Sequence, residues 1–167
     1  MPSPRKPFRI NVGFIMHEEA GYSHEIPFAL EKIKLDDLEL QDLIGTVTIG
    51  RTPQGLIVQG IFSAQTKVEC VRCLNEFTIP LTSEFTELYA FTKKSLSESE
   101  LLVPDDAHID LAQLIREYAL LEIPIKPLHD PECKGLCIEC GQDLNVKDCG
   151  HNQELDDSPF SALKNLL

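Results

Sequence analysis

The feature that most constrains the fold of this chain is the placement of its six cysteines. Two form the pair "CVRC" at Cys70 and Cys73, and the other four lie in "HDPECKGLCIECGQDLNVKDCGH", which begins at His129 and ends at His151. A Cys-x-x-Cys turn lets two thiolates converge on one tetrahedral ion, with backbone amides directed at the sulfur atoms. Gly141 directly follows "CIEC", where such a turn commonly needs a positive φ. Cysteines spaced in this way indicate a metal site, a disulfide, a redox pair or buried thiols without metal.

The six cysteines, together with His129 and His151, supply enough donors for two tetrahedral zinc sites. Proximity along the chain favours one compact zinc knuckle and a second site that joins a hairpin turn to the later segment. The knuckle set is Cys137, Cys140, Cys149 and His151, and the second set is Cys70, Cys73, His129 and Cys133. An alternative grouping combines "CVRC" and "CIEC" in one four-sulfur site, and the sequence leaves both groupings open.

Sequence context favours zinc over the other states of these cysteines. A thioredoxin-like redox pair requires a helix that opens at the CxxC motif, whereas "CVRCLNEFTIPL" leads into another strand pattern. The stretch "MPSPRKPFRINVGF" has no apolar segment of signal type, so we expect no secretory signal and a reducing compartment, where disulfides do not persist. Four protein ligands leave no position for a substrate, so we predict one or two structural zinc ions.

Much of the chain before residue 92 alternates apolar and polar side chains, as half-buried strands do. The expected strands are residues 8–16, a segment around Val47 and Ile49, and residues 56–64 and 66–70, and the strand pattern continues over residues 76–91. Residues 28–42 are expected to be extended at first and irregular later. Pro80 lacks a ladder N–H, so it predicts a sheet edge or a bulge. Glycines 45, 50 and 60 predict bulges or tight bends. The pattern therefore indicates an antiparallel meander.

Two helices are predicted toward the C-terminal end of the chain. The main helix covers residues 110–122, with Asp110 as N-cap, one apolar face and Pro124 as its end. A short terminal helix is predicted in "DSPFSALKNLL", with Ser158 as N-cap and Pro159 at its first position.

The expected fold class is α+β. It comprises a β-rich antiparallel twisted sheet or partly open barrel with one main helix, a cysteine-rich C-terminal arm that resembles a zinc knuckle, and the short terminal helix. The expected domains are a β-rich domain over residues 1–128 and, packed on the same domain, a knuckle with the C-terminal helix over residues 129–167.

Charge and motif content limit the classes of function. The net charge is −12, and phosphate binding needs lysine and arginine to displace counterions, so we expect any RNA contact to be indirect. The sequence has no phosphate-binding glycine loop, serine elbow or dinucleotide fingerprint, and its apolar runs are shorter than the roughly 20 residues of a membrane span. We predict neither an enzyme nor a membrane protein. An open-coordination metal, or a Cys70 thiol pKa well below 7, would favour an enzyme.

Two blocks of the sequence resemble the YceD family, the large ribosomal RNA subunit accumulation proteins. The first is "GLIVQGIFSAQTKVECVRCLNEFTIPLTSEFTELY", in which Cys70, Arg72, Cys73 and Leu74 match a C-x-R-C-L arrangement. The second is "LLEIPIKPLHDPECKGLCIECGQDLN", and the tail "SPFSALKNLL" resembles the family's C-terminal helix. Residues 149–151, "CGH", stand where the family often has Cys-x-Cys.

The resemblance implies a non-catalytic factor in large-subunit ribosomal RNA accumulation, processing or assembly, in the bacterial cytoplasm or the plastid stroma. Its implied partner is a ribosomal protein or a pre-ribosomal particle, and the negative charge favours a basic ribosomal protein. Arg72 is expected to donate to the sulfur atoms in preference to RNA phosphate. The alternatives are a zinc-dependent or thiol-redox enzyme and a protein-interaction module unrelated to ribosomes.

Overall fold

A computed structural model describes residues 7–93 and 101–151 of the chain. The chain divides into two compact units. The first unit comprises Met1–Lys67 and Thr78–Ile125, and the second comprises Val68–Phe77 and Lys126–Leu167. The second unit therefore combines the turn that carries "CVRC" with the chain that follows the main helix. The predicted division into domains 1–128 and 129–167 assigns that turn differently and stays a prediction.

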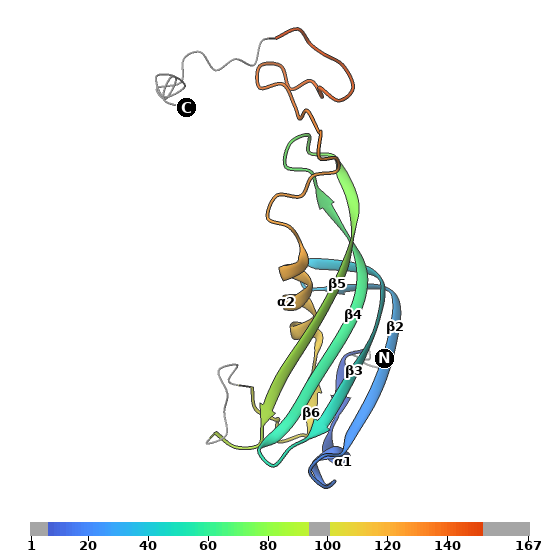
Figure 1. The fold of residues 1–167 in the computed structure, drawn as a ribbon, viewed down its shortest axis with the longest axis vertical. Coiled ribbons are helices and arrows are strands. Elements are labelled where there is room, and N and C mark those ends of the chain that lie inside the picture. Colours follow the sequence, from blue (N-terminus) through green and yellow to red (C-terminus); the bar gives the residue numbers. More distant parts are fainter. Residues whose placement is uncertain (1–6, 94–100, 152–167) are drawn as a thin grey trace, which may run out of the picture. The chain divides into compact units, whose positions relative to one another are not determined.

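The first unit is built on a four-stranded sheet in the order β2-β3-β4-β5 (Figure 1). Its strands are β2 (Ser23–Leu35), β3 (Leu38–Arg51), β4 (Gly55–Glu69) and β5 (Glu76–Ala90), and the last residues of β4 and the first of β5 belong to the second unit. β3 pairs antiparallel with both β2 and β4. Sequential strands are neighbours, which confirms the predicted meander. The described strands form an open sheet and not a closed barrel.

Two predicted strand boundaries in the sheet are wrong. Residues 56–64 and 66–70 are predicted as separate strands, but β4 is one strand that joins them and ends at Glu69. Thr66 is buried on the same face of β4 as the apolar residues before it, and a polar side chain is tolerated there because its hydroxyl donates to the Glu39 carbonyl at 2.8 Å. Residues 28–42 belong to β2 and β3, which are joined by a tight turn where Asp36 adopts a positive φ of 53°, and the expected later irregularity is confined to their end, where Asp42 has a φ of 49°. Aspartate tolerates this conformation, so no glycine signals the turn.

Residues 8–16, predicted as one strand, instead form β1 (Arg9–Asn11) and the single helical turn α1 (Gly13–Met16). The Asn11 side-chain oxygen accepts the N–H of Gly13 at 2.9 Å, and this local bond turns the chain out of the strand. β1 pairs antiparallel with β6 (His108–Asp110). Val12 and Ile15 are buried, a spacing that a helical turn presents on one face.

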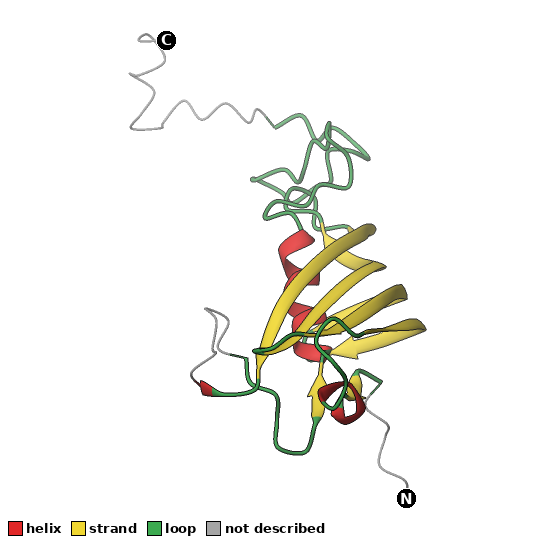
Figure 2. Ribbon diagram, turned by 60° about the horizontal axis from the view of Figure 1, so that its bottom comes forward, coloured by secondary structure: helices red, strands yellow, loops and turns green. Residues whose placement is uncertain are grey.

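Helix α2 (Ala112–Glu122) lies against one face of the sheet, here called the inner face (Figure 2). The predicted main helix is confirmed, but Leu111 is its N-cap, and Asp110 lies in β6 and accepts the Ala112 N–H at 3.1 Å. The Tyr118 ring stacks on Phe85 with centroids 5.2 Å apart. The core between helix and sheet includes Leu40, Leu43, Val47, Ile49, Val58, Phe62, Leu81, Leu114, Ile115 and Ala119.

Two of the three glycines at which bulges or tight bends were predicted, Gly45 and Gly60, instead allow close packing, whereas a Cβ on Gly50 would have no heavy atom closer than 3.9 Å. A Cβ on Gly60 would lie 2.3 Å from the Phe85 ring, and a Cβ on Gly45 would lie 2.5 Å from a backbone oxygen. The register shift between β3 and β4 falls between Gln41 and Ile44 instead. Gly45 and Gly60 therefore mark close approach of neighbouring groups.

Three further sequence predictions concern single elements. Pro80 lies in β5, an edge strand of the described sheet, as predicted. The predicted terminal helix, with Ser158 and Pro159, lies outside the described residues. Among the helices that are described, none has the length and apolar character needed to cross a membrane.

Candidate metal centre

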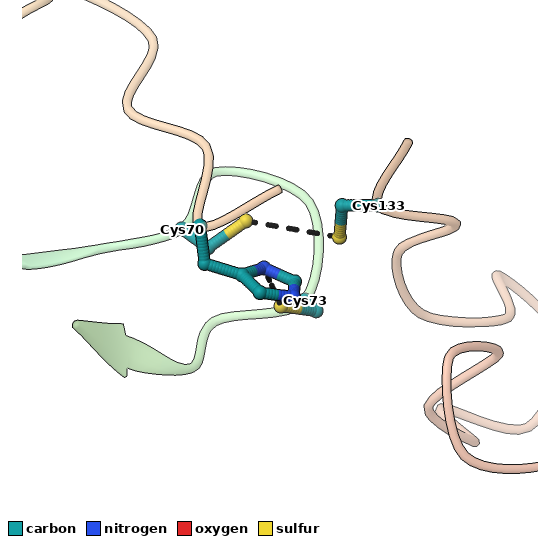
Figure 3. Close-up of side chains that lie close together, drawn as sticks. Cys70, Cys73 and Cys133 are labelled. Carbon is teal, nitrogen blue, oxygen red and sulfur yellow. Dashed lines mark hydrogen bonds between the residues drawn. The ribbon is translucent and has the colours of Figure 1, made fainter. Parts of the chain in front are cut away.

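The first of two Cys/His groups in the second unit consists of Cys70, Cys73, His129 and Cys133. One ligand atom from each residue lies within 4.8 Å of the others. The Cys70 and Cys133 sulfur atoms are 3.8 Å apart, and the Cys73 sulfur is 3.3 Å from His129 Nδ1. Figure 3 shows Cys70 and Cys73 on one loop and Cys133 on a separate segment, with their sulfur atoms close together. A tetrahedral ion with Zn–S bonds of about 2.3 Å would separate its sulfurs by roughly 3.8 Å.

Backbone hydrogen bonds shape the "CVRC" turn for this convergence. The Leu74 N–H donates to the Cys70 carbonyl at 2.9 Å, and the Cys70 N–H donates to the Asn75 carbonyl at 3.0 Å. Leu74 has a positive φ of 61°, a conformation that is uncommon for a bulky side chain and carries strain. The chain closes a tight turn here, which leaves both sulfurs on one side of it.

Further bonds hold the later segment against this turn. The Val71 N–H donates to the Pro127 carbonyl at 3.0 Å, and the Leu136 N–H donates to the Arg72 carbonyl at 3.1 Å. Arg72 Nη1 donates to the Cys133 carbonyl at 2.7 Å. The expected bond from the Arg72 side chain to sulfur is thus replaced by a bond to the Cys133 backbone carbonyl, which lies beside the turn.

The second group consists of Cys137, Cys140, Cys149 and His151, whose ligand atoms also lie within 4.8 Å of one another. The Gly141 N–H donates to the Cys137 carbonyl at 2.8 Å, and Gly141 has a φ of 72°. Glycine adopts this left-handed conformation without steric cost, so the positive φ expected after the second cysteine of "CIEC" is confirmed. The structure brings together the two sets that proximity favoured, and metal binding by them stays a prediction.

The two groups differ in their exposure to solvent. Cys70, Cys73 and Cys133 are 0%, 4% and 3% exposed, and they form a small buried cluster of their own. In the second group Cys137 is buried, whereas Cys140 is exposed and Cys149 is half-buried. All six cysteines lie in the described residues, and none of them is joined in a disulfide.

The surroundings of the sulfurs separate their pKa values. Burial raises the pKa of Cys70, but the side chain of His129 and nearby backbone N–H groups outweigh it and lower that pKa to about 5. Burial raises the pKa of Cys73 to about 11. The N–H of Cys140 lowers the pKa of Cys137 to about 6 despite desolvation. One thiolate in each group is thus favoured at neutral pH, and thiolates are the form that binds metal.

One polar residue beside the first group was missed in the sequence. Asn145 donates from Nδ2 to the Cys133 sulfur, with 3.4 Å between the two atoms. Only its position between Cys140 and Cys149 set it apart in the sequence, because an asparagine in a polar loop has many uses.

Comparison with known proteins bears on the two cysteine-rich blocks. The sequence matches the family described as "Large ribosomal RNA subunit accumulation protein YceD" over residues 58–167. The chain belongs to the YceD family. The matched range contains every member of both Cys/His groups.

The chain is similar to proteins from bacteria and from plants. An uncharacterized protein of Mycobacterium tuberculosis is 34% identical over 142 residues, which cover 83% of this chain and 67% of the relative. The chloroplastic YCED homolog 1 of Arabidopsis thaliana is 38% identical over 63 residues, or 38% of this chain and 20% of the relative. The Zea mays homolog of the same name is 45% identical over 41 residues, 25% of this chain and 14% of the relative. No solved structure matches the chain.

Proposed function

We propose that this protein is a non-catalytic factor in the accumulation of large-subunit ribosomal RNA, and that zinc ions hold its cysteine-rich unit in shape. The ribosomal part is supported by membership of the YceD family and by the name of the chloroplastic relatives. The metal part is supported by one observation above all, the convergence of two complete four-donor groups. The proposed compartment is the bacterial cytoplasm or the plastid stroma, where large subunits assemble.

The chemistry of the donors favours zinc over other common ions. Each group offers three sulfurs and one imidazole, and thiolate with imidazole suits zinc, whereas calcium and magnesium prefer oxygen. Four protein donors close a tetrahedral site, which is the arrangement of structural zinc. The proposed role of the first ion is therefore to hold two separate chain segments together, and that of the second is to close the loop between Cys137 and His151.

The charge of the loaded sites favours a protein partner. Three thiolates around one divalent ion leave a net charge of −1 at each site, so zinc does not offset the acidic character of a chain with net charge −12. Such a surface attracts cations and repels RNA phosphate. The proposed partner is a basic ribosomal protein or a pre-ribosomal particle that presents one.

A thiol-redox enzyme is the second candidate, because the Cys70 pKa of about 5 meets the condition set for it. A reactive thiolate also needs access, and Cys70 is 0% exposed. Alkylation with iodoacetamide separates the two candidates. Slow alkylation of Cys70 that accelerates on addition of chelator supports the metal site, and rapid alkylation of Cys70 in protein that contains zinc supports the redox enzyme.

Elemental analysis of protein purified without chelator tests the metal directly. We expect two zinc ions per chain in the unsubstituted protein and one in the variant Cys70→Ser/Cys73→Ser. Val71→Ser is the matched control, because Val71 lies in the same turn, is 49% exposed and supplies no sulfur. Protein without zinc, or with paired disulfides in place of it, would contradict the proposal.

Sucrose-gradient sedimentation tests the ribosomal role. We expect the tagged protein to comigrate with precursors of the large subunit, and we expect its depletion to lower the level of large-subunit ribosomal RNA relative to the small-subunit species. Val71→Ser protein should restore that level, and Cys70→Ser/Cys73→Ser protein should fail to do so. Equal loss of both ribosomal RNAs would argue against a role in the large subunit.

A further inference from the structure

The side chain of Asn145 acts outside the group to which its sequence position assigns it. The residue lies between Cys140 and Cys149, in the loop that closes the second group. Its Nδ2 nevertheless donates to the sulfur of Cys133, a member of the first group, at 3.4 Å. The loop of one group therefore supplies a hydrogen bond to the ligand of the other.

Neighbouring atoms determine the orientation of the Asn145 amide. Its Oδ1 accepts the backbone N–H of Lys134 at 2.8 Å, and its Nδ2 also donates to Asp143 Oδ1 at 2.8 Å. A flipped amide would direct its NH₂ group at the Lys134 N–H and its oxygen at the carboxylate and the sulfur. The donor end therefore has to face Cys133.

Asp143 connects this amide to the "CVRC" turn. Its Oδ1 accepts the backbone N–H of Asn145 at 2.8 Å, and its Oδ2 accepts the side-chain amide of Asn75 at 3.2 Å. Asn75 follows the turn, and its carbonyl accepts the N–H of Cys70. One carboxylate thus links the residue that donates to sulfur with the segment that carries two other ligands.

We propose that Asn145 is a positioning residue for metal binding by the first group, a role that rests on the metal sites proposed above. An N–H donor aimed at a coordinated thiolate stabilises its charge and fixes its direction. The first group needs this help because Cys70, Cys73 and Cys133 are all buried, and three sulfur anions in a poorly solvated space repel one another. In the second group Cys140 is exposed, so solvent is available to its sulfur.

The variant Asn145→Asp tests the inference with little change of shape. Aspartate keeps an oxygen to accept the Lys134 N–H, loses the donor to both the Cys133 sulfur and Asp143, and places a negative charge beside the thiolate and the Asp143 carboxylate. The intact chain would be loaded with ¹¹³Cd²⁺, a spectroscopic substitute for zinc, and each cadmium resonance assigned through its coupling to cysteine protons. We expect the resonance of the first-group ion to shift. In competition with EDTA, the affinity of the first group for that ion should be lowered about 10- to 100-fold. The second-group resonance should change little.

Two further variants make the test specific. Asn11→Asp introduces the same charge at an asparagine of the first unit, so it should leave both resonances and both affinities unchanged. Asn145→Ala removes the donor without adding charge, so we expect a smaller loss of first-group affinity than in Asn145→Asp. It serves as the deciding variant if Asn145→Asp fails to fold.

The possible outcomes separate this inference from the proposed function. Unchanged first-group affinity in both Asn145 variants would overturn the positioning role and leave the metal sites standing. Equal weakening of both ions would also overturn it, since the loop would then act only as general structure. Absence of cysteine-coupled cadmium in the unsubstituted chain would overturn the proposed metal sites and this inference together.

Discussion

The two units of this chain are stabilised by different physical interactions. In the first unit a long curved sheet and helix α2 enclose large apolar side chains such as Phe62 and Ile115, which are 1% and 0% exposed. In the second unit the buried cluster consists of Cys70, Cys73 and Cys133, with a few half-buried apolar residues around it. Apolar burial organises the first unit, whereas sulfur atoms occupy the centre of the second.

This difference in stabilising interactions follows from how much apolar surface each unit buries on folding. The buried cluster of the second unit contains few apolar side chains, and small units with little apolar burial are commonly stabilised by metals or disulfides. A sheet with a packed helix has no such need. The comparison therefore predicts that the two units respond to different perturbations.

Removal of metal should produce the largest difference between the units. Each structural zinc contributes on the order of 10 kcal/mol to folding of the segment around it. After treatment with a strong chelator we expect hydrogen exchange to become fast in residues 70–75 and 127–147, while amides of β3 stay protected. Readdition of zinc should restore protection. Unchanged hydrogen exchange in both units after complete metal removal would contradict the claim that metal stabilises the second unit.

Phe62→Ala should destabilise the first unit and leave the second unit unaffected. Truncation of a buried phenylalanine removes apolar contacts and leaves a cavity, at a cost of about 3–5 kcal/mol. Urea unfolding followed by far-ultraviolet circular dichroism measures the loss, and zinc per chain in the folded protein should be unchanged. Ile61→Ala is the matched control, because Ile61 directly precedes Phe62 in β4 and is 61% exposed. We expect it to change stability by no more than about 0.5 kcal/mol.

Gly60→Ala should destabilise the first unit by a smaller amount. The added Cβ would meet the Phe85 ring at 2.3 Å, and displacing a packed ring costs about 1–3 kcal/mol. Gly50→Ala is the control, because its nearest heavy atom would be 3.9 Å away. The double variant Gly60→Ala/Phe85→Leu should recover part of the loss, as measured in a double-mutant cycle. Equal effects of both single alanine variants would rule out the clash.

Arg116→Gln should have the smallest effect, confined to a surface ion pair of the first unit. The hydrogen bond from Arg116 lowers the pKa of Asp37. The stabilisation of the folded state by the Asp37–Arg116 ion pair is present above the unfolded-state pKa of Asp37, about 3.9, and is lost as pH falls through the lower folded-state pKa of Asp37. We expect carboxyl titration by NMR to show a higher Asp37 pKa in the variant. Arg9→Gln, which removes the partner of Asp106, should leave the Asp37 pKa unchanged.

Local signals in the sequence were sufficient to predict secondary-structure elements with a long apolar pattern and turns whose defining residues are close in sequence. The apolar spacing before Pro124 predicted α2, and Gly141 marked the turn in "CIEC". The same alternation misled at residues 8–16, because one helical turn can bury the same side chains as a short strand. Sequence signals were also absent for the β2–β3 turn, where aspartate stands in place of glycine.

The contacts of Asn145 and Arg72 could not be predicted from the sequence. Both side chains reach Cys133 or its backbone, from sequence separations of 12 and 61 residues. Such bonds depend on the path that the chain takes between the partners. The sequence shows that each side chain can donate, and it does not show which acceptor is near.

The sequence by itself determined the kind of protein: membership of the YceD family, a strand-rich meander with one main helix, and a supply of soft donors suited to zinc. These follow from periodicity and from residue chemistry, which act over a few neighbouring positions. Only the tertiary structure decided that Cys70 and Cys73 meet His129 and Cys133, and that an asparagine from another loop faces their site. Contacts between distant segments are selected by the packing of the whole unit, and no short stretch of sequence contains that information.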